Sequence, residues 1–181
     1  MSEWKLDKTH SSISFAIRHM MVTTVHGRFT DFDATLNFDP DRPQKAHVQA
    51  TIRTESIDTG VSDRDNHLRS ADFFDAANNP VIKFESTNVD LKGDDEAKVT
   101  GNLTIGDVTR PITLEVSYLG QQNNPFTGIP TLGFEARAKL NREDFGLTWN
   151  QALETGGVLV GRDVKILLDL QAVPSQEPAG V

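Results

Sequence analysis

Apolar and polar residues alternate along most of the chain, which is the pattern of strands that bury one face. The alternation recurs in eight segments, and each of them reads as one strand. Their apolar positions are Ile13, Phe15, Ile17 and Met21; Phe32, Ala34, Leu36 and Phe38; Val48, Ala50 and Ile52; Ile82 and Phe84; Val99, Leu103 and Ile105; Ile112, Leu114, Val116 and Tyr118; Leu132, Phe134, Ala136, Ala138 and Leu140; and Val164, Ile166, Leu168, Leu170 and Ala172.

The connections between these segments are short and polar, at 38–45, 91–98 and 105–112. Short connections predict antiparallel neighbours, and a set of such strands with one apolar face forms either a sandwich or a closed barrel. The first alternation runs from about Ser12 to Val25. A strand of about ten residues already spans ~33 Å, so strands this long favour a tall barrel. We expect one domain over 1–173 and a flexible tail over 174–181.

Between two predicted strands, residues 63–80 read DRDNHLRSADFFDAANNP. Asp63, Asp65 and His67 imitate the alternate ligands of a calcium loop, but the sixth position is Leu68 where glycine is required and the twelfth is Phe74 where glutamate is required. The stretch instead predicts a short helix capped by Ser62 or Asp63, followed by a turn that Ser70 caps. Leu68, Phe73 and Phe74 would then face the barrel together.

The net charge of −8 would repel nucleic acid and anionic lipid surfaces, so neither is an expected partner. The chain has no cysteine, which excludes disulfides and thiolate chemistry. Neither a secretory signal nor a run of about 20 apolar residues is visible, so we expect a cytoplasmic protein without stable membrane insertion.

No motif in the sequence predicts catalysis. GxSxG, GxGxxG and the phosphate-binding P-loop are absent, and the five histidines form neither HxH nor HExxH, so we expect neither an enzyme nor a metal site. His19 shares the inward parity of Phe15 and Ile17. It reads equally as a core histidine with a hydrogen-bond partner or as a polar group that meets a ligand inside the barrel.

Five stretches of the sequence, in this order, resemble the YceI-like family from about Trp4 to Val173. They are WKLDKTHSSISFAIRHM at 4–20, HGRFTDFDATLNFD at 26–39, ESIDTGVSDRDNHLRSADFFDAANNPVIKFES at 55–86, GNLTIGDVTRPITLEV at 101–116 and NREDFGLTWNQALETGGVLVGRDVKILLDL at 141–170. Each stretch alone is weak, but their order over nearly the whole chain is specific.

The resemblance implies an all-β fold, a lipocalin-like eight-stranded antiparallel β-barrel with one or two short helices. It also implies non-enzymatic binding, storage or transport of a polyisoprenoid lipid, a prenyl pyrophosphate or an isoprenoid quinone, in an elongated pocket, without a cofactor. The residues that we expect to line this pocket are Phe15, Ile17, His19, Met21, Phe32, Leu36, Ile52, Leu68, Phe73, Phe74, Phe84, Leu103, Phe134 and Leu168. A pyrophosphate head would need cations at the mouth, for which the candidates are Arg18, Arg64, Arg69 and Arg142.

Two alternatives remain beside this hypothesis. One is an enzyme or redox module that acts on an isoprenoid lipid with His19 as its polar group. The other is an interaction protein whose barrel is filled by its own side chains. The sequence does not decide between a monomer and a homodimer, nor does it identify the isoprenoid.

Overall fold

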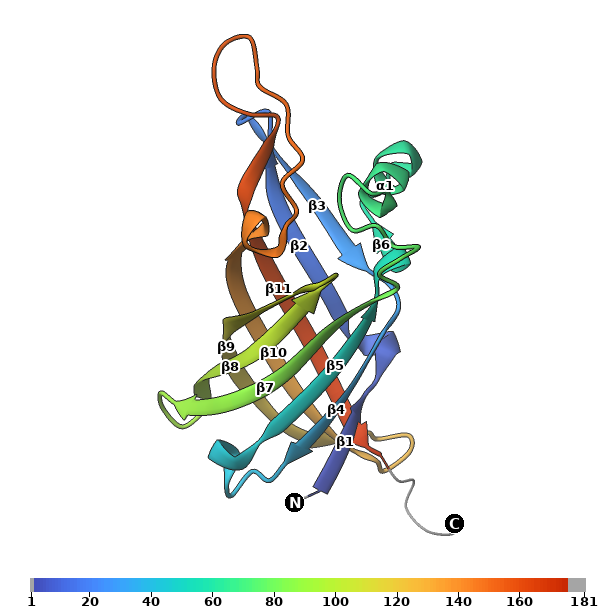
Figure 1. Ribbon diagram of the computed structural model, residues 1–181. Helices are drawn as coiled ribbons and strands as arrows, with labels where there is room; N and C mark the ends of the chain where they lie inside the picture. Colours follow the sequence, from blue (N-terminus) through green and yellow to red (C-terminus); the bar gives the residue numbers. More distant parts are fainter. Residues whose placement is uncertain (1, 176–181) are drawn as a thin grey trace.

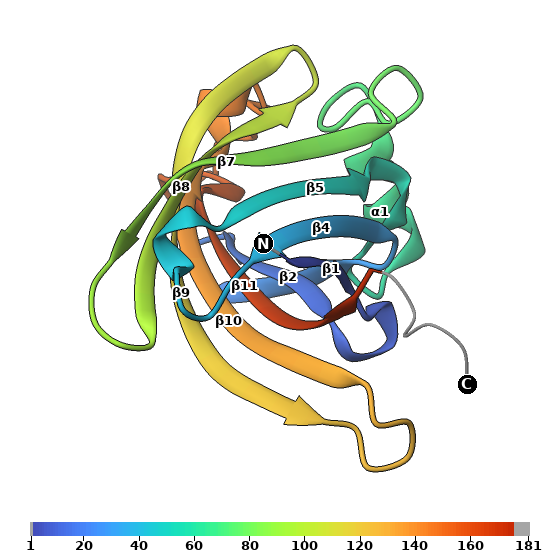
Figure 2. The same ribbon diagram turned by 90° about the horizontal axis from the view of Figure 1, so that it is seen from below.

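The alternating segments form strands that close into a ring in the computed structural model, which describes residues 2–175 (Figures 1 and 2). The strands are β1 (Ser2–Leu6), β2 (Ser12–His19), β3 (Thr23–Phe29), β4 (Phe32–Phe38), β5 (His47–Arg53), β6 (Ile57–Asp58), β7 (Val81–Leu91), β8 (Glu96–Ile105), β9 (Val108–Asn123), β10 (Pro130–Asn141) and β11 (Val160–Pro174). The described helices are α1 (Ser62–Arg69) and four short 3₁₀ turns at Lys8–His10, Pro43–Lys45, Thr54–Ser56 and Arg142–Phe145.

Eight antiparallel strands make the ring, in the order β1-β4-β5-β7-β8-β9-β10-β11, and pairing of β1 with β11 closes it. The first half of β11 pairs with β2 instead of β1, and β3 and β6 continue the sheet at that end. Helix α1 follows β6 at the same end of the barrel (Figure 1). The predicted eight-stranded barrel with a short helix is therefore confirmed.

The prediction that one strand runs from Ser12 to Val25 is wrong. Strand β2 ends at His19, the chain reverses, and β3 begins at Thr23, which pairs with His19. Met20 and Met21 make the reversal by adopting positive φ angles of 51° and 63°. Both are apolar, so the alternation continued through a turn that carries no glycine or asparagine to mark it.

The predicted flexible tail also begins too early. Pro174 is the last residue of β11, and the Ser175 amide donates a hydrogen bond to the Glu3 carbonyl oxygen at 3.1 Å. The remaining residues of the predicted tail, 176–181, lie outside the described part of the chain.

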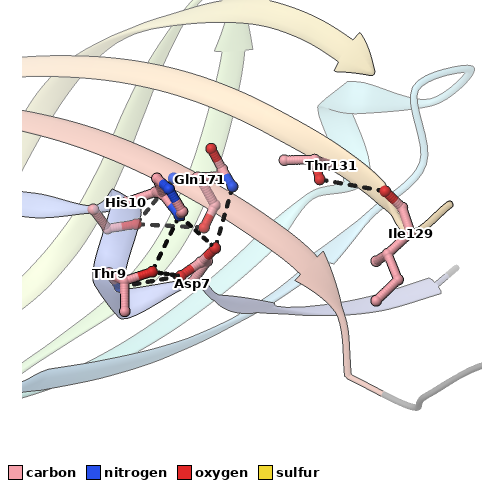
Figure 3. A network of polar contacts seen from close by, with 7 residues as sticks. Asp7, Thr9, His10, Ile129, Thr131 and Gln171 are labelled. Carbon is pink, nitrogen blue, oxygen red and sulfur yellow. Dashed lines mark hydrogen bonds and ion pairs between the residues drawn. The ribbon is translucent and has the colours of Figure 1, made fainter. Parts of the chain in front are cut away.

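A polar network holds the seam where β11 changes partner from β1 to β2 (Figure 3). The Asp7 amide donates to the Gln171 carbonyl oxygen at 2.8 Å, and the Gln171 side-chain amide donates to the Asp7 carboxylate at 3.2 Å. That carboxylate also accepts from the Thr9 amide and hydroxyl and lies 2.9 Å from His10 Nδ1. Burial alone would raise the pKa of Asp7, but the hydrogen bonds with Thr9 and His10 hold it below its ordinary value.

The end of the barrel next to the chain termini is packed with aromatic rings. Phe38 lies 5.4 Å from both Tyr118 and Phe134, measured between ring centroids, and the buried Trp4 donates its indole N–H to the Phe38 carbonyl oxygen. Leu132 is fully buried in the same cluster. A second buried cluster, Ile82, Phe84, Leu103, Ile105, Phe145 and Leu147, lies on the wall formed by β7 and β8 and on the segment after β10.

The segment around α1 is tied to the barrel by its charged side chains. The predicted cap by Ser62 or Asp63 is wrong, because the N-cap residue is Val61 and makes no side-chain cap. The N-terminal end of α1 is instead held by Asp65, which is buried and accepts hydrogen bonds from the Thr59 amide and hydroxyl at 2.8 and 2.6 Å. The predicted cap by Ser70 is present, since its hydroxyl oxygen accepts from the Asp72 amide at 3.3 Å.

Candidate functional site

A cavity of about 770 Å³ lies inside the barrel. Its volume is within the range of pockets that hold small organic ligands, roughly 300–1,000 Å³. All of the predicted pocket residues except Met21 lie on its wall: Phe15, Ile17, His19, Phe32, Leu36, Ile52, Leu68, Phe73, Phe74, Phe84, Leu103, Phe134 and Leu168. Because inward positions alternate with outward ones on every strand, the apolar set lines the cavity along its length.

Met21 is absent from the wall, so its predicted place inside the barrel is wrong. Its side chain is 63% exposed at the β2–β3 turn. The physical reason is the chain reversal at Met20 and Met21, which ends the alternation of β2 at His19.

Three aromatic rings narrow the cavity at the end where α1 lies, which we call the α1 end. His67 of α1 lies 4.7 Å from Trp149 and 5.0 Å from Phe73 between ring centroids, and both contacts are edge-to-face. The imidazole of His67 is also hydrogen-bonded to Asp72, whose carboxylate lies 2.9 Å from His67 Nε2. Helix α1 and the segment 146–159 therefore meet over the cavity through rings that all line it.

Phe73 and Phe74 have different surroundings although they are adjacent. Phe74 packs edge-to-face on Phe29 of β3 at 6.0 Å and contacts the buried cluster of β7 and β8. Phe73 stands beside Trp149 at 5.4 Å, at the α1 end. Phe74 is thus part of the barrel packing, whereas Phe73 belongs to the group of rings at the α1 end of the cavity.

The candidate cations fall into two groups. Arg18 and Arg64 reach the cavity wall at the α1 end, together with His19. Arg64 donates from Nε to the Thr59 hydroxyl and from Nη2 to the Thr59 carbonyl oxygen. Arg69 is not on the wall, because its guanidinium donates to the carbonyl oxygens of Glu55 and Ile57 behind α1.

Arg142 lines the cavity but is committed to the backbone. It is 3% exposed, and its guanidinium donates four hydrogen bonds to the carbonyl oxygens of Leu147, Trp149, Val160 and Gly161 at 2.7–3.3 Å. Burial lowers the pKa of Arg142, which the neighbouring Glu143 carboxylate partly offsets. Arg142 is therefore a tether for the segment 146–159 rather than the free head-group ligand that the sequence suggested.

The opposite end of the cavity is acidic. There the wall includes Asp94 and Asp95 of the β7–β8 turn and Glu96, the first residue of β8. Burial raises the pKa of the nearby Tyr118, and the negative charge of Asp95 raises it further. The cavity wall thus carries Arg18, Arg64 and Asp63 at the α1 end and Asp94, Asp95 and Glu96 near the other.

Trp149 and the role of Arg142 were missed by sequence reasoning. The segment that contains Trp149 has no alternation, and its only signal is its presence in the family-like stretch 141–170. The segment is placed by Arg142 and by Asn150, whose amide donates to the Val160 carbonyl oxygen at 2.8 Å. Contacts of this kind leave no period in the sequence.

The wall offers apolar contact and few reactive groups. Across residues 2–175, no group of three His, Asp or Glu side chains is arranged to hold a metal ion. No helix within that part of the chain is long and apolar enough to cross a membrane.

Comparison with known proteins agrees with this architecture. Residues 4–172 match the model of the YceI-like domain. A UPF0312 protein of Pseudomonas paraeruginosa is 40% identical over 174 residues, which cover 95% of this chain and 87% of the relative.

Solved structures share the fold. BcnA of Burkholderia cenocepacia matches with a TM-score of 0.80 at 25% identity, over 92% of this chain and 98% of its own. A polyisoprenoid binding domain from Saccharophagus degradans, implicated in plant cell wall breakdown, has a TM-score of 0.70 at 16% identity over 96% and 99% of the two chains, and at that identity the likeness concerns the fold alone. The barrel, the cavity and a sequence match over nearly all of the chain show that this protein belongs to the YceI-like family.

Proposed function

We propose that the protein binds a polyisoprenoid lipid in its barrel and stores or carries it without chemical change. The observation that carries the proposal is the apolar cavity of about 770 Å³. The domain from Saccharophagus degradans, which has the same fold, is described as polyisoprenoid-binding.

The size of the cavity supports a ligand over a packing defect. A cavity of about 770 Å³ is far larger than the voids left between packed side chains, so it is filled by either water or a ligand. Water needs 2–4 polar partners in such a site, and a wall built mainly from Phe, Leu, Ile and Val offers few.

The chemistry of the ligand follows from the wall and from its two ends. Burial of a long apolar tail stabilises the complex by ~0.8 kcal/mol per CH₂ but discriminates poorly between tails. Selectivity then depends on the ends of the cavity, where Arg18, Arg64 and His19 lie with one carboxylate, Asp63, at the α1 end and Asp94 and Asp95 lie at the other. We infer that the polar head lies at the α1 end, whether it is a pyrophosphate or a quinone ring.

For His19 we propose contact with the bound lipid and no catalytic role. Among residues 2–175, no other side chain is hydrogen-bonded to its ring, so nothing orients it as a general base. Its position suits contact with the ligand head.

The test is native mass spectrometry and organic extraction of the purified protein, followed by uptake of an offered isoprenoid quinone and prenyl pyrophosphate from detergent. Ala50 lines the cavity, whereas Thr51 on the same strand is exposed. We expect Ala50→Phe to reduce uptake and the matched Thr51→Phe to retain it. Absence of lipid and of uptake in the wild type would refute the proposal, as would turnover of the offered lipid that is lost in His19→Ala.

A further inference from the structure

The β2–β3 turn exposes three large apolar side chains that the fold does not require. Met20, Met21 and Val22 are 45%, 63% and 73% exposed. Met20 and Met21 both have positive φ angles, a conformation that costs free energy in residues other than glycine and that asparagine tolerates better. A polar turn would fold more easily, so a strained apolar turn suggests a function for the exposed surface.

This turn is attached to the segment that lines the α1 end of the cavity. The Met20 amide donates to the Leu159 carbonyl oxygen at 2.7 Å, and the Met21 sulfur lies against Gly157, where a Cβ atom would collide with it. His19, which directly precedes the turn, and Leu159, to which the turn is hydrogen-bonded, both line the cavity. Figure 1 shows the turn beside the segment 146–159 at the α1 end of the barrel.

The charge of the molecule is distributed unevenly between its two ends. The segments that form the α1 end, 16–28, 57–75 and 149–163, carry five arginines and seven carboxylates, a net formal charge of −2. The rest of the chain carries the remaining −6 of the net charge of −8. An anionic lipid surface would therefore repel the α1 end less than the rest of the molecule, which favours approach with the α1 end first.

We propose that Met20, Met21 and Val22 form a membrane-contacting tip that inserts shallowly into a lipid bilayer and brings the α1 end of the cavity to the lipid. This deepens the proposed function and rests on it, because a polyisoprenoid tail resides in membranes and must enter the cavity from there. Three side chains are too few for a stable dimer interface, which buries on the order of 1,200–2,000 Å² in total. They suit a reversible contact with lipid, in which a small apolar area is buried at each encounter.

The test measures transfer of an isoprenoid quinone to the full-length protein from phosphatidylcholine vesicles. The double variant Met21→Asn and Val22→Thr keeps residue types that the turn tolerates and removes the two most exposed of the three apolar side chains. The matched control is Leu119→Ser and Phe126→Ser, which removes two exposed side chains, 64% and 95% exposed, that lie away from the cavity wall. We expect the tip variant to slow transfer by about tenfold or more and to lose flotation with vesicles, and the control to keep both.

Uptake of the same quinone from detergent separates this proposal from the proposed function. We expect the tip variant to equal the wild type there, because neither substituted residue lines the cavity. Equal vesicle transfer by wild type and tip variant, an equal loss in the control, or a change of oligomeric state in the tip variant would overturn the membrane proposal. Absence of uptake from detergent by the wild type would instead refute lipid binding itself.

Discussion

Arg142 is the side chain on which the α1 end most depends, and its replacement by methionine is a sharp test of the structure. Methionine keeps much of the apolar stem and removes the guanidinium. The four hydrogen bonds to the carbonyl oxygens of Leu147, Trp149, Val160 and Gly161 would all be lost. These bonds join both ends of the segment 146–159, so their loss would release it as a unit.

The magnitude is smaller than the sum of the bonds. A hydrogen bond to a charged group contributes about 1.5–3 kcal/mol, but some of the released carbonyl oxygens can bind water instead. Removing the charge also relieves the cost of burying a guanidinium that is 3% exposed. We expect Arg142→Met to lower the free energy of unfolding by about 2–4 kcal/mol and Tm by roughly 5–15 °C.

The assay is urea unfolding followed by circular dichroism, with thermal melting as a second measurement. Arg162→Met is the matched control, because the Arg162 side chain is 66% exposed and pairs with Glu143 at 3.5 Å. An exposed pair contributes only about 0–1 kcal/mol. Arg142→Lys keeps the charge but has a single nitrogen, so its loss of stability should lie between those of the other two variants.

Two results would refute this reasoning. One is a Tm of Arg142→Met within about 1 °C of that of Arg162→Met. The other is full stability of Arg142→Lys, which would mean that the charge matters and the fork of hydrogen bonds does not. A lower urea slope for Arg142→Met alone would show that the segment 146–159 unfolds separately from the barrel.

Three further predictions follow from contacts described above. Asp65→Ala should lower the free energy of unfolding by ~1–3 kcal/mol, measured by urea unfolding, because it leaves the Thr59 amide without its buried acceptor. Phe74→Ala should destabilise the barrel by about 2–4 kcal/mol, because Phe74 packs against the barrel strands, whereas Phe73→Ala should reduce lipid retention with little change in Tm. A larger loss of stability in Phe73→Ala than in Phe74→Ala would contradict these two roles. The pKa of Asp7 is lowered in the folded state, so its contribution to stability is present above its ordinary pKa of 3.8 and is lost as the pH falls through the lowered value. The stability difference between wild type and Asp7→Asn should therefore shrink as the pH is lowered from about 5 to 2, and a difference that grows would contradict the network of Figure 3.

The strands and the inward positions could be predicted from the sequence because a period of two is a direct consequence of strand geometry. Phe84, Leu103 and Phe134 follow from parity alone. The inward position predicted for Met21 was wrong, because the apolar residues of a turn without glycine or asparagine continue the alternation of the strand. The alternation of inward and outward residues is the same in a hollow barrel and in a filled one. The existence of the cavity could therefore not be derived from the alternation.

The α1 end was the least predictable part of the molecule. Its order depends on side chains that bind backbone groups, as Arg142 and Asp65 do, and such bonds require the right position in space rather than a pattern along the chain. The sequence indicated that Leu68 and the two adjacent phenylalanines turn inward. No pattern in the sequence indicated that Trp149 would pack against Phe73.

Closure of the barrel by β1 and β11 has a consequence for the order in which the protein folds. Trp4 is paired with Pro174, so the pair that completes the ring joins strands about 170 residues apart. The hairpins from β7 to β11 join neighbours along the chain and can form early, but β1 has no β11 to pair with until that strand has been synthesised. During synthesis the barrel therefore remains an open sheet with its apolar interior exposed, and we expect this late-closing intermediate to be the species most prone to aggregation and most in need of a chaperone.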